Sequence, residues 1–194
     1  MGGLVTAAQL AALCEDALPG FTVDVMEGSS TMKFVRTVGD RTVTVKVDCC
    51  NPETYQADEE EAEDDEAGVQ ALHATVEIER AGQADKMLFA VLLPMEEEGV
   101  GPEINHVLVL GKDQTMDDAE KDDAYLPSDF SELDTGLQGS FAKYLDDLGV
   151  SFEFIDGVRD AAEKKEQLEY VHWLRRIRGS VRGTAVTNAR VLDA

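Results

Sequence analysis

The sequence contains few positive charges for its length, and it has no long uninterrupted run of apolar residues. It carries 17 Lys and Arg against 40 Asp and Glu in 194 residues, a formal net charge of −23 at pH 7. A surface this negative repels phosphate backbones, which argues against general nucleic-acid binding. No stretch approaches the roughly 20 apolar residues of a membrane helix. We therefore predict no membrane insertion.

Cysteine is also scarce. Cys14, Cys49 and Cys50 show no CxxC spacing, and the two neighbouring cysteines would point to opposite faces of a strand. This pattern predicts no disulfide framework and favours a reducing compartment.

Motifs for catalysis or metal binding are missing too. His73, His106 and His172 show no HxxxH or HExxH spacing, and the chain has no Walker loop, GxGxxG or GxSxG. The acidic stretches lack the central Gly and terminal Glu of an EF-hand. We predict no enzyme, no cofactor and no dedicated metal site. A low-affinity calcium or cation buffer is the alternative function, because the density of acids alone supports weak cation binding.

What is present indicates one α+β domain over residues 1–194. Thr6 and Gln9 form a capping box that begins a helix over 6–18. A strand meander over 21–125 follows, with short β-branched runs of period two and a tight hairpin at Gly39 and Asp40. We expect an antiparallel sheet of about seven strands.

Two helices are predicted in the last third, over 130–148 and 151–181. The first has an apolar stripe at helical spacing, formed by Leu133, Leu137, Phe141, Leu145 and Leu148. The second ends in another stripe with spacings typical of a helix seam. The N-terminal helix is its expected partner, and a second subunit could be contacted as well. The predicted oligomer or helix seam comprises Leu10, Leu13, Tyr170, Trp173, Leu174, Ile177 and Val181.

Charge is unevenly distributed along the chain. Residues 1–158 contain 9 basic and 35 acidic side chains (net −26), whereas residues 159–194 contain 8 and 5 (net +3). An acidic loop over 57–67 and a polar connection over 113–123 hold the densest acids, and we expect both to bind basic proteins. The predicted partner-binding acidic surface comprises Asp58, Glu59, Glu60, Glu61, Glu63, Asp64, Asp65, Glu66, Asp117, Asp118, Glu120, Asp122 and Asp123.

The segment from Tyr125 to Ile177 matches a family signature in both spacing and residue type. The matching positions are Tyr125, Pro127, Phe130, Leu133, Asp134, Leu137, Gln138, Phe141, Tyr144, Leu145, Gly149, Lys165, Glu166, Gln167, Tyr170, Trp173, Leu174 and Ile177. On these residues the chain resembles the mitochondrial acidic matrix protein family, also called the mitochondrial glycoprotein family. That family includes the complement globular-head receptor and hyaluronan-binding protein of animals.

The resemblance implies a twisted antiparallel sheet flanked by one N-terminal and two C-terminal helices, assembled as a ring-shaped homotrimer. It also implies a non-enzymatic protein of the mitochondrial matrix, a chaperone-like scaffold in oxidative phosphorylation, mitochondrial translation or RNA processing. The expected partners are basic proteins, including RNA-binding proteins of mitochondria. A matrix location implies a transit peptide, which we expect to be absent from this chain.

Overall fold

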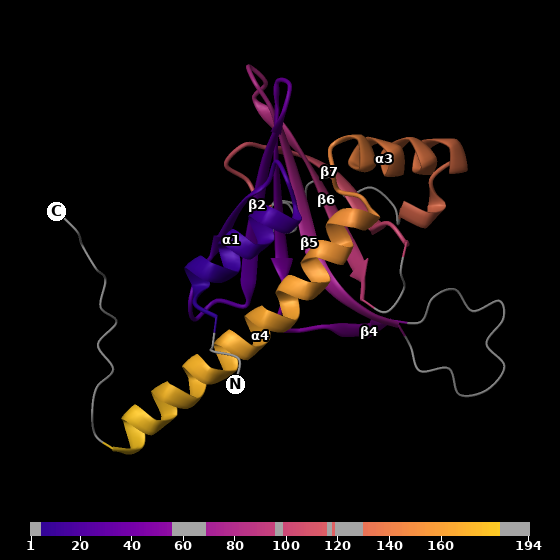
Figure 1. The fold of residues 1–194 in the computed structure, drawn as a ribbon. Coiled ribbons are helices and arrows are strands. Elements are labelled where there is room, and N and C mark those ends of the chain that lie inside the picture. The colour runs from indigo at the N-terminus through magenta and orange to yellow at the C-terminus, as the bar shows by residue number, and fades with distance from the viewer. Residues whose placement is uncertain (1–4, 56–68, 96–98, 116–117, 119–129, 183–194) are drawn as a thin grey trace, which may run out of the picture.

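The structure, a computed structural model, describes residues 5–55, 69–95, 99–115, 118 and 130–182 (Figure 1). The chain forms, in order, α1 (Ala7–Ala17), β1 (Thr22–Val25), β2 (Thr31–Val38), β3 (Arg41–Asp48), β4 (Glu53–Tyr55), β5 (Val69–Arg80), β6 (Asp85–Pro94), β7 (Glu103–Gly111), η1 (Phe130–Glu132), α3 (Thr135–Asp147) and α4 (Phe152–Val181).

These strands make one antiparallel sheet. Six of them run in the order β1-β2-β3-β5-β6-β7, and the short β4 pairs with one end of β5. Together with the three α-helices, this confirms the predicted α+β fold of one N-terminal helix, an antiparallel sheet and two C-terminal helices.

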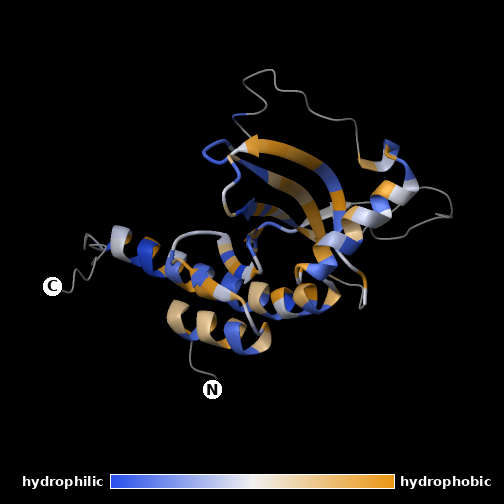
Figure 2. Cartoon of the chain, turned by 90° about the horizontal axis from the view of Figure 1, so that it is seen from above, coloured by the Kyte–Doolittle hydropathy of each residue, from blue (hydrophilic) through white to orange (hydrophobic). Residues whose placement is uncertain are grey.

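Apolar and polar side chains alternate along the strands, and this alternation determines which face of the sheet is buried. Phe34, Val43, Val45 and Val47 are fully buried on the side of the helices, while their sequence neighbours point to the other face. Figure 2 shows the curved sheet with α1 and α4 side by side against it. The core between them includes Phe154, whose ring centroid lies 5.0 Å from that of Phe21 and 5.3 Å from that of Phe34.

The predicted capping box at the start of α1 is confirmed. The amide N of Thr6 donates to Gln9 Oε1 at 2.9 Å, and the amide N of Gln9 donates to Thr6 Oγ1 at 3.2 Å. These bonds satisfy amide groups that the first turn of a helix would otherwise leave unpaired.

The helix expected over 130–148 is divided in the structure. A single 3-10 turn covers Phe130–Glu132, and α3 begins only at Thr135. The cause is Asp134, whose side chain accepts from the amides of Gly136 at 3.0 Å and Leu137 at 3.3 Å and so caps a new helix.

The contact between α1 and α4 depends on the absence of a side chain at Gly157. A Cβ there would lie 2.5 Å from Leu18 Cδ2 and 2.8 Å from Leu18 Cγ. We expect Gly157→Ala to lower the free energy of unfolding by about 1–3 kcal/mol, because the Leu18 side chain or the two helices must shift to admit the methyl group, although Ala favours the helix. Urea unfolding measures this loss.

Gly139 in α3 provides the matched control, since no heavy atom lies within 4 Å of a Cβ placed there. Gly139→Ala should stabilise the protein by up to about 1 kcal/mol through helix propensity alone. Equal effects of the two substitutions would contradict tight packing at Gly157.

Candidate protein-interaction surfaces

The second half of α4 projects beyond the sheet and carries exposed apolar side chains (Figure 1). We call this set the α4 stripe. Its exposed fractions are 58% for Tyr170, 53% for Trp173, 42% for Leu174, 42% for Ile177 and 81% for Val181. The rings of Tyr170 and Trp173 stack with centroids 6.0 Å apart. A continuous apolar patch of this kind is typical of an interface with another protein chain.

The structure differs from the expectation that α1 covers the α4 stripe. A hollow between the two helices, lined by residues from Leu10 to Ala17 and from Gly157 to Lys164, shows that α1 meets the first half of α4. Leu10 is buried in the core and Leu13 is 49% exposed. An 11-residue helix spans only about 16 Å and cannot cover both halves of a 30-residue helix. The predicted role of the stripe in an oligomer stays a prediction.

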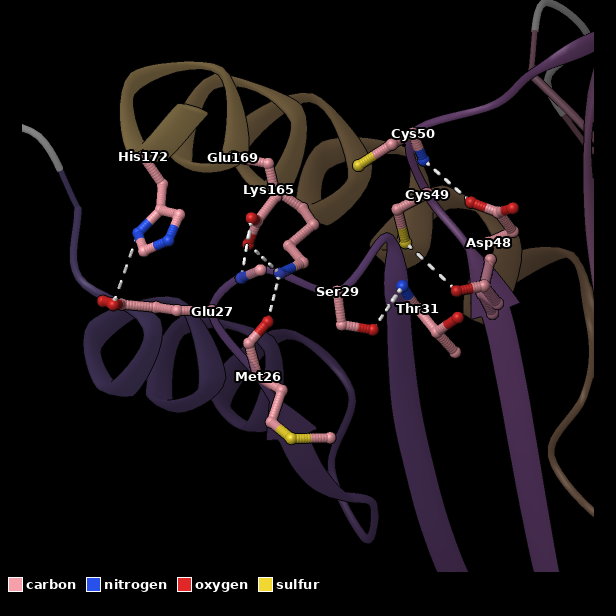
Figure 3. A network of polar contacts seen from close by, with 12 residues as sticks. Met26, Glu27, Ser29, Thr31, Asp48, Cys49, Cys50, Lys165, Glu169 and His172 are labelled. Carbon is pink, nitrogen blue, oxygen red and sulfur yellow. Dashed lines mark hydrogen bonds and ion pairs between the residues drawn. The ribbon is translucent and has the colours of Figure 1, made fainter. Parts of the chain in front are cut away.

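A buried lysine fixes α4 where the projecting half begins (Figure 3). Lys165 has no exposed surface, and its Nζ donates to the carbonyl oxygen of Met26 at 2.7 Å and to Glu169 Oε1 at 2.5 Å. Glu169 Oε2 in turn accepts from the amide of Gly28 at 2.8 Å. His172 Nδ1 lies 3.8 Å from Glu27 Oε2. The turn between β1 and β2 is thus tied to α4 by side chains that sequence analysis did not identify as a site.

Charge changes sign along α4. Its first half has an exposed row of carboxylates at spacings of three, four and three residues, namely Glu153, Asp156, Asp160 and Glu163. Its last turns carry the exposed cations Arg175, Arg176 and Arg178 beside the stripe. The projecting end of α4 is therefore both apolar and basic, whereas the chain as a whole has a net charge of −23.

Asp118 is the member of the predicted partner-binding acidic surface that the structure describes. Its Oδ2 accepts from the amide of Thr115 at 2.8 Å and from Thr115 Oγ1 at 2.6 Å. Asp118 thus closes a local turn. The other members lie outside the described residues: Asp58, Glu59, Glu60, Glu61, Glu63, Asp64, Asp65, Glu66, Asp117, Glu120, Asp122 and Asp123.

The sheet face away from the helices carries a small charge network. Glu77 lies 2.7 Å from Lys46 Nζ and 3.4 Å from Lys86 Nζ, and Lys86 is only 6% exposed. Burial acts to raise the pKa of Glu77, but the hydrogen bond from Lys46 and the charge of Lys86 hold it below its usual value. Beside this network lies a hollow of about 500 Å³ lined in part by His73 and His106.

Cys14, Cys49 and Cys50 are free thiols in the structure. Burial raises the pKa of Cys14 to about 11 and that of Cys49 to about 12, so both are poor nucleophiles at neutral pH. Within the described ranges, no group of three or more His, Cys, Asp or Glu is placed to hold a metal ion. No helix in those ranges is both long and apolar enough to cross a bilayer.

The fold and these surfaces define a strongly acidic α+β protein with a projecting amphipathic helix. A family model described as MAM33, mitochondrial glycoprotein, matches residues 8–181, and the chain belongs to this family. The match confirms the resemblance found in the sequence, and it supports a mitochondrial protein.

The solved structures that are similar to the chain include the following two. One is a hypothetical protein from Leishmania major of unknown function, described as a sequence homologue of human p32 protein. It has a TM-score of 0.61 and 18% identity, covering 88% of this chain and 96% of that one. The other is the p22 protein of Trypanosoma brucei, with a TM-score of 0.57 and 18% identity. The match covers 88% of this chain and 99% of that one. At this identity the likeness concerns the fold alone. A search of curated proteins found no match.

Proposed function

We propose that this protein is a non-enzymatic acidic homotrimer of the mitochondrial matrix that binds basic proteins. The RNA-binding proteins of mitochondria are the expected partners, in support of oxidative phosphorylation, mitochondrial translation or RNA processing. The observation that carries the proposal is the net charge of −23 in a member of a mitochondrial protein family.

Charge of this density favours cationic partners through long-range attraction. It raises the rate of encounter and weakens as salt rises, because the Debye length falls from about 10 Å at 0.1 M to about 3 Å at 1 M. Individual exposed ion pairs contribute little, about 0–1 kcal/mol each, so binding depends on several acids acting together. The acidic surface at 58–66 and 117–123 is the proposed contact, and the exposed carboxylates of α4 add to the same field.

Neutralising the acidic loop should weaken binding of a Lys- and Arg-rich peptide by about tenfold or more at low salt. The variant replaces Asp58, Glu59, Glu60 and Glu61 with Asn or Gln, which removes four charges from one segment. Each lost pair costs a few tenths of a kcal/mol, and about 1.4 kcal/mol corresponds to tenfold. Fluorescence anisotropy of the labelled peptide over a salt series measures the affinity.

The matched control removes the same number of charges from α4, at Glu153, Asp156, Asp160 and Glu163. A smaller loss in this variant would place the contact on the loop, and an equal loss would indicate that the general field binds the peptide. Affinity that is unchanged by added salt and by both variants would refute the proposal.

A further inference from the structure

A cavity of about 240 Å³ lies on the helix side of the sheet, where the β2–β3 turn, the β5–β6 turn and the end of β7 come together. The amide of Ala81 donates to the carbonyl oxygen of Asp40 at 2.8 Å, and the amide of Lys112 donates to that of Ala84 at 3.3 Å. These bonds hold the strand ends in place. Tyr144 of α3 closes one side.

The cavity is both cationic and apolar. Arg41 and Arg80 line it together with Ile78, Met87 and Val109, and Val109 is 68% exposed. Two guanidinium groups beside an apolar wall are unusual in a chain with 17 basic and 40 acidic side chains.

Arg41 has its donors available. Its guanidinium carbon lies 5.5 Å from the ring centroid of Tyr144, a cation–π contact that orients the group without using an N–H. Neither a hydrogen bond nor an ion pair joins its side chain to the residues that the structure describes. Among the residues that the structure describes, Arg41 therefore offers a positioned fork of N–H groups to an incoming acceptor.

Arg80 is only partly engaged. Its Nε donates to Asp40 Oδ2 at 2.6 Å, which leaves its two terminal nitrogens for another acceptor. Two nearby carboxylates oppose additional negative charge, since Asp40 holds Arg80 and Asp85 lines the cavity. Lys86 also lines the cavity, but its charge is paired with Glu77 at 3.4 Å. Glu79 of β5 lies 3.7 Å from Lys112, which follows the end of β7. This balance suits a ligand with a single negative charge.

We propose that this cavity binds a small amphiphilic monocarboxylate, with its carboxylate between Arg41 and Arg80 and its apolar part against Ile78, Met87 and Val109. The planar guanidinium matches a carboxylate in a two-point hydrogen bond. The volume is below the roughly 300–1,000 Å³ of sites for drug-sized ligands, which fits a short acid. The inference does not depend on the proposed binding of basic proteins.

Hexanoate is the probe, titrated into the full chain at constant ionic strength while the Nε–H signals of the arginines are followed by NMR. We expect saturable shifts at Arg41 and Arg80 and none with uncharged hexanamide. Arg41→Gln should weaken hexanoate binding by about tenfold. Asp40→Asn should instead tighten it by about threefold, because it releases the Nε of Arg80 and removes a negative charge.

Arg175→Gln is the matched control, since it removes one positive charge from an exposed site on α4 that does not line the cavity. It should leave hexanoate affinity unchanged. Circular dichroism checks that each variant is folded, and the gain at Asp40→Asn cannot arise from misfolding. The proposal would be overturned if Arg41→Gln bound hexanoate with the affinity of the wild type. It would also be overturned if inorganic phosphate bound with the same affinity as hexanoate, or if Asp40→Asn lowered the affinity for hexanoate.

Discussion

Trp173→Asp combined with Ile177→Asp is expected to abolish assembly and leave monomeric or aggregated protein where the wild type forms the proposed trimer. Both side chains lie on the α4 stripe and are 53% and 42% exposed in the single chain. A carboxylate placed in an interface must lose its hydration without a partner, and apolar anchors of this size each contribute about 2 kcal/mol or more. Light scattering coupled to size exclusion measures the mass.

The sole tryptophan of the chain gives a second measurement on the wild type. If Trp173 is buried between subunits, its fluorescence maximum should shift to longer wavelength as the protein is diluted and dissociates. An emission maximum that is independent of concentration, together with full mass at every dilution of the double variant, would show that the stripe is not the assembly interface.

Leu137→Asp is the matched control for this experiment. Leu137 is 44% exposed on α3, close to the exposure of Ile177, but it lies outside the α4 stripe. The same chemical change there should keep the native mass. Loss of assembly in both proteins would indicate a general effect of added charge rather than a specific seam.

Local pattern was enough to predict most of the fold. Period-two alternation indicated the strands, and Thr6 with Gln9 located the first helix because a cap involves residues only three positions apart. The predicted helix start at residue 130 was wrong by five residues, because the cap at Asp134 was not recognised within a longer apolar stripe. Helix periodicity identifies a face better than it identifies an end.

The arrangement around α4 could not be predicted in the same way. The exposed stripe was visible as a pattern, but a pattern does not say which element covers it, and α1 proved to meet the other half of the helix. The hydrogen bond from Lys165 to Met26 joins residues 139 positions apart. Only the paired spacing of Lys165 and Glu169 was a local signal, and such i,i+4 pairs are usually exposed on helices.

Lys165→Met is expected to lower the free energy of unfolding by about 3–5 kcal/mol. Methionine matches the length of lysine, so the loss comes from the two part-buried acceptors left without their donor, the carbonyl oxygen of Met26 and the carboxylate of Glu169. Glu169 also holds the amide of Gly28, so an unpaired charge there loosens the β1–β2 turn from α4. Urea unfolding at fixed protein concentration measures the loss, because assembly makes stability concentration-dependent.

Lys143→Met is the control that separates burial from charge. Lys143 also pairs with a carboxylate four residues later, Asp147 at 2.8 Å, but its side chain is 72% exposed, so its removal should change the free energy of unfolding far less than Lys165→Met does. Combining Lys165→Met with Glu169→Gln should recover part of the loss, because a neutral amide is less costly to bury unpaired than a carboxylate. Similar losses at the two lysines, or no recovery in the double variant, would mean that the buried ion pair does not anchor α4. The projecting stripe would then have to be positioned by its apolar contacts alone.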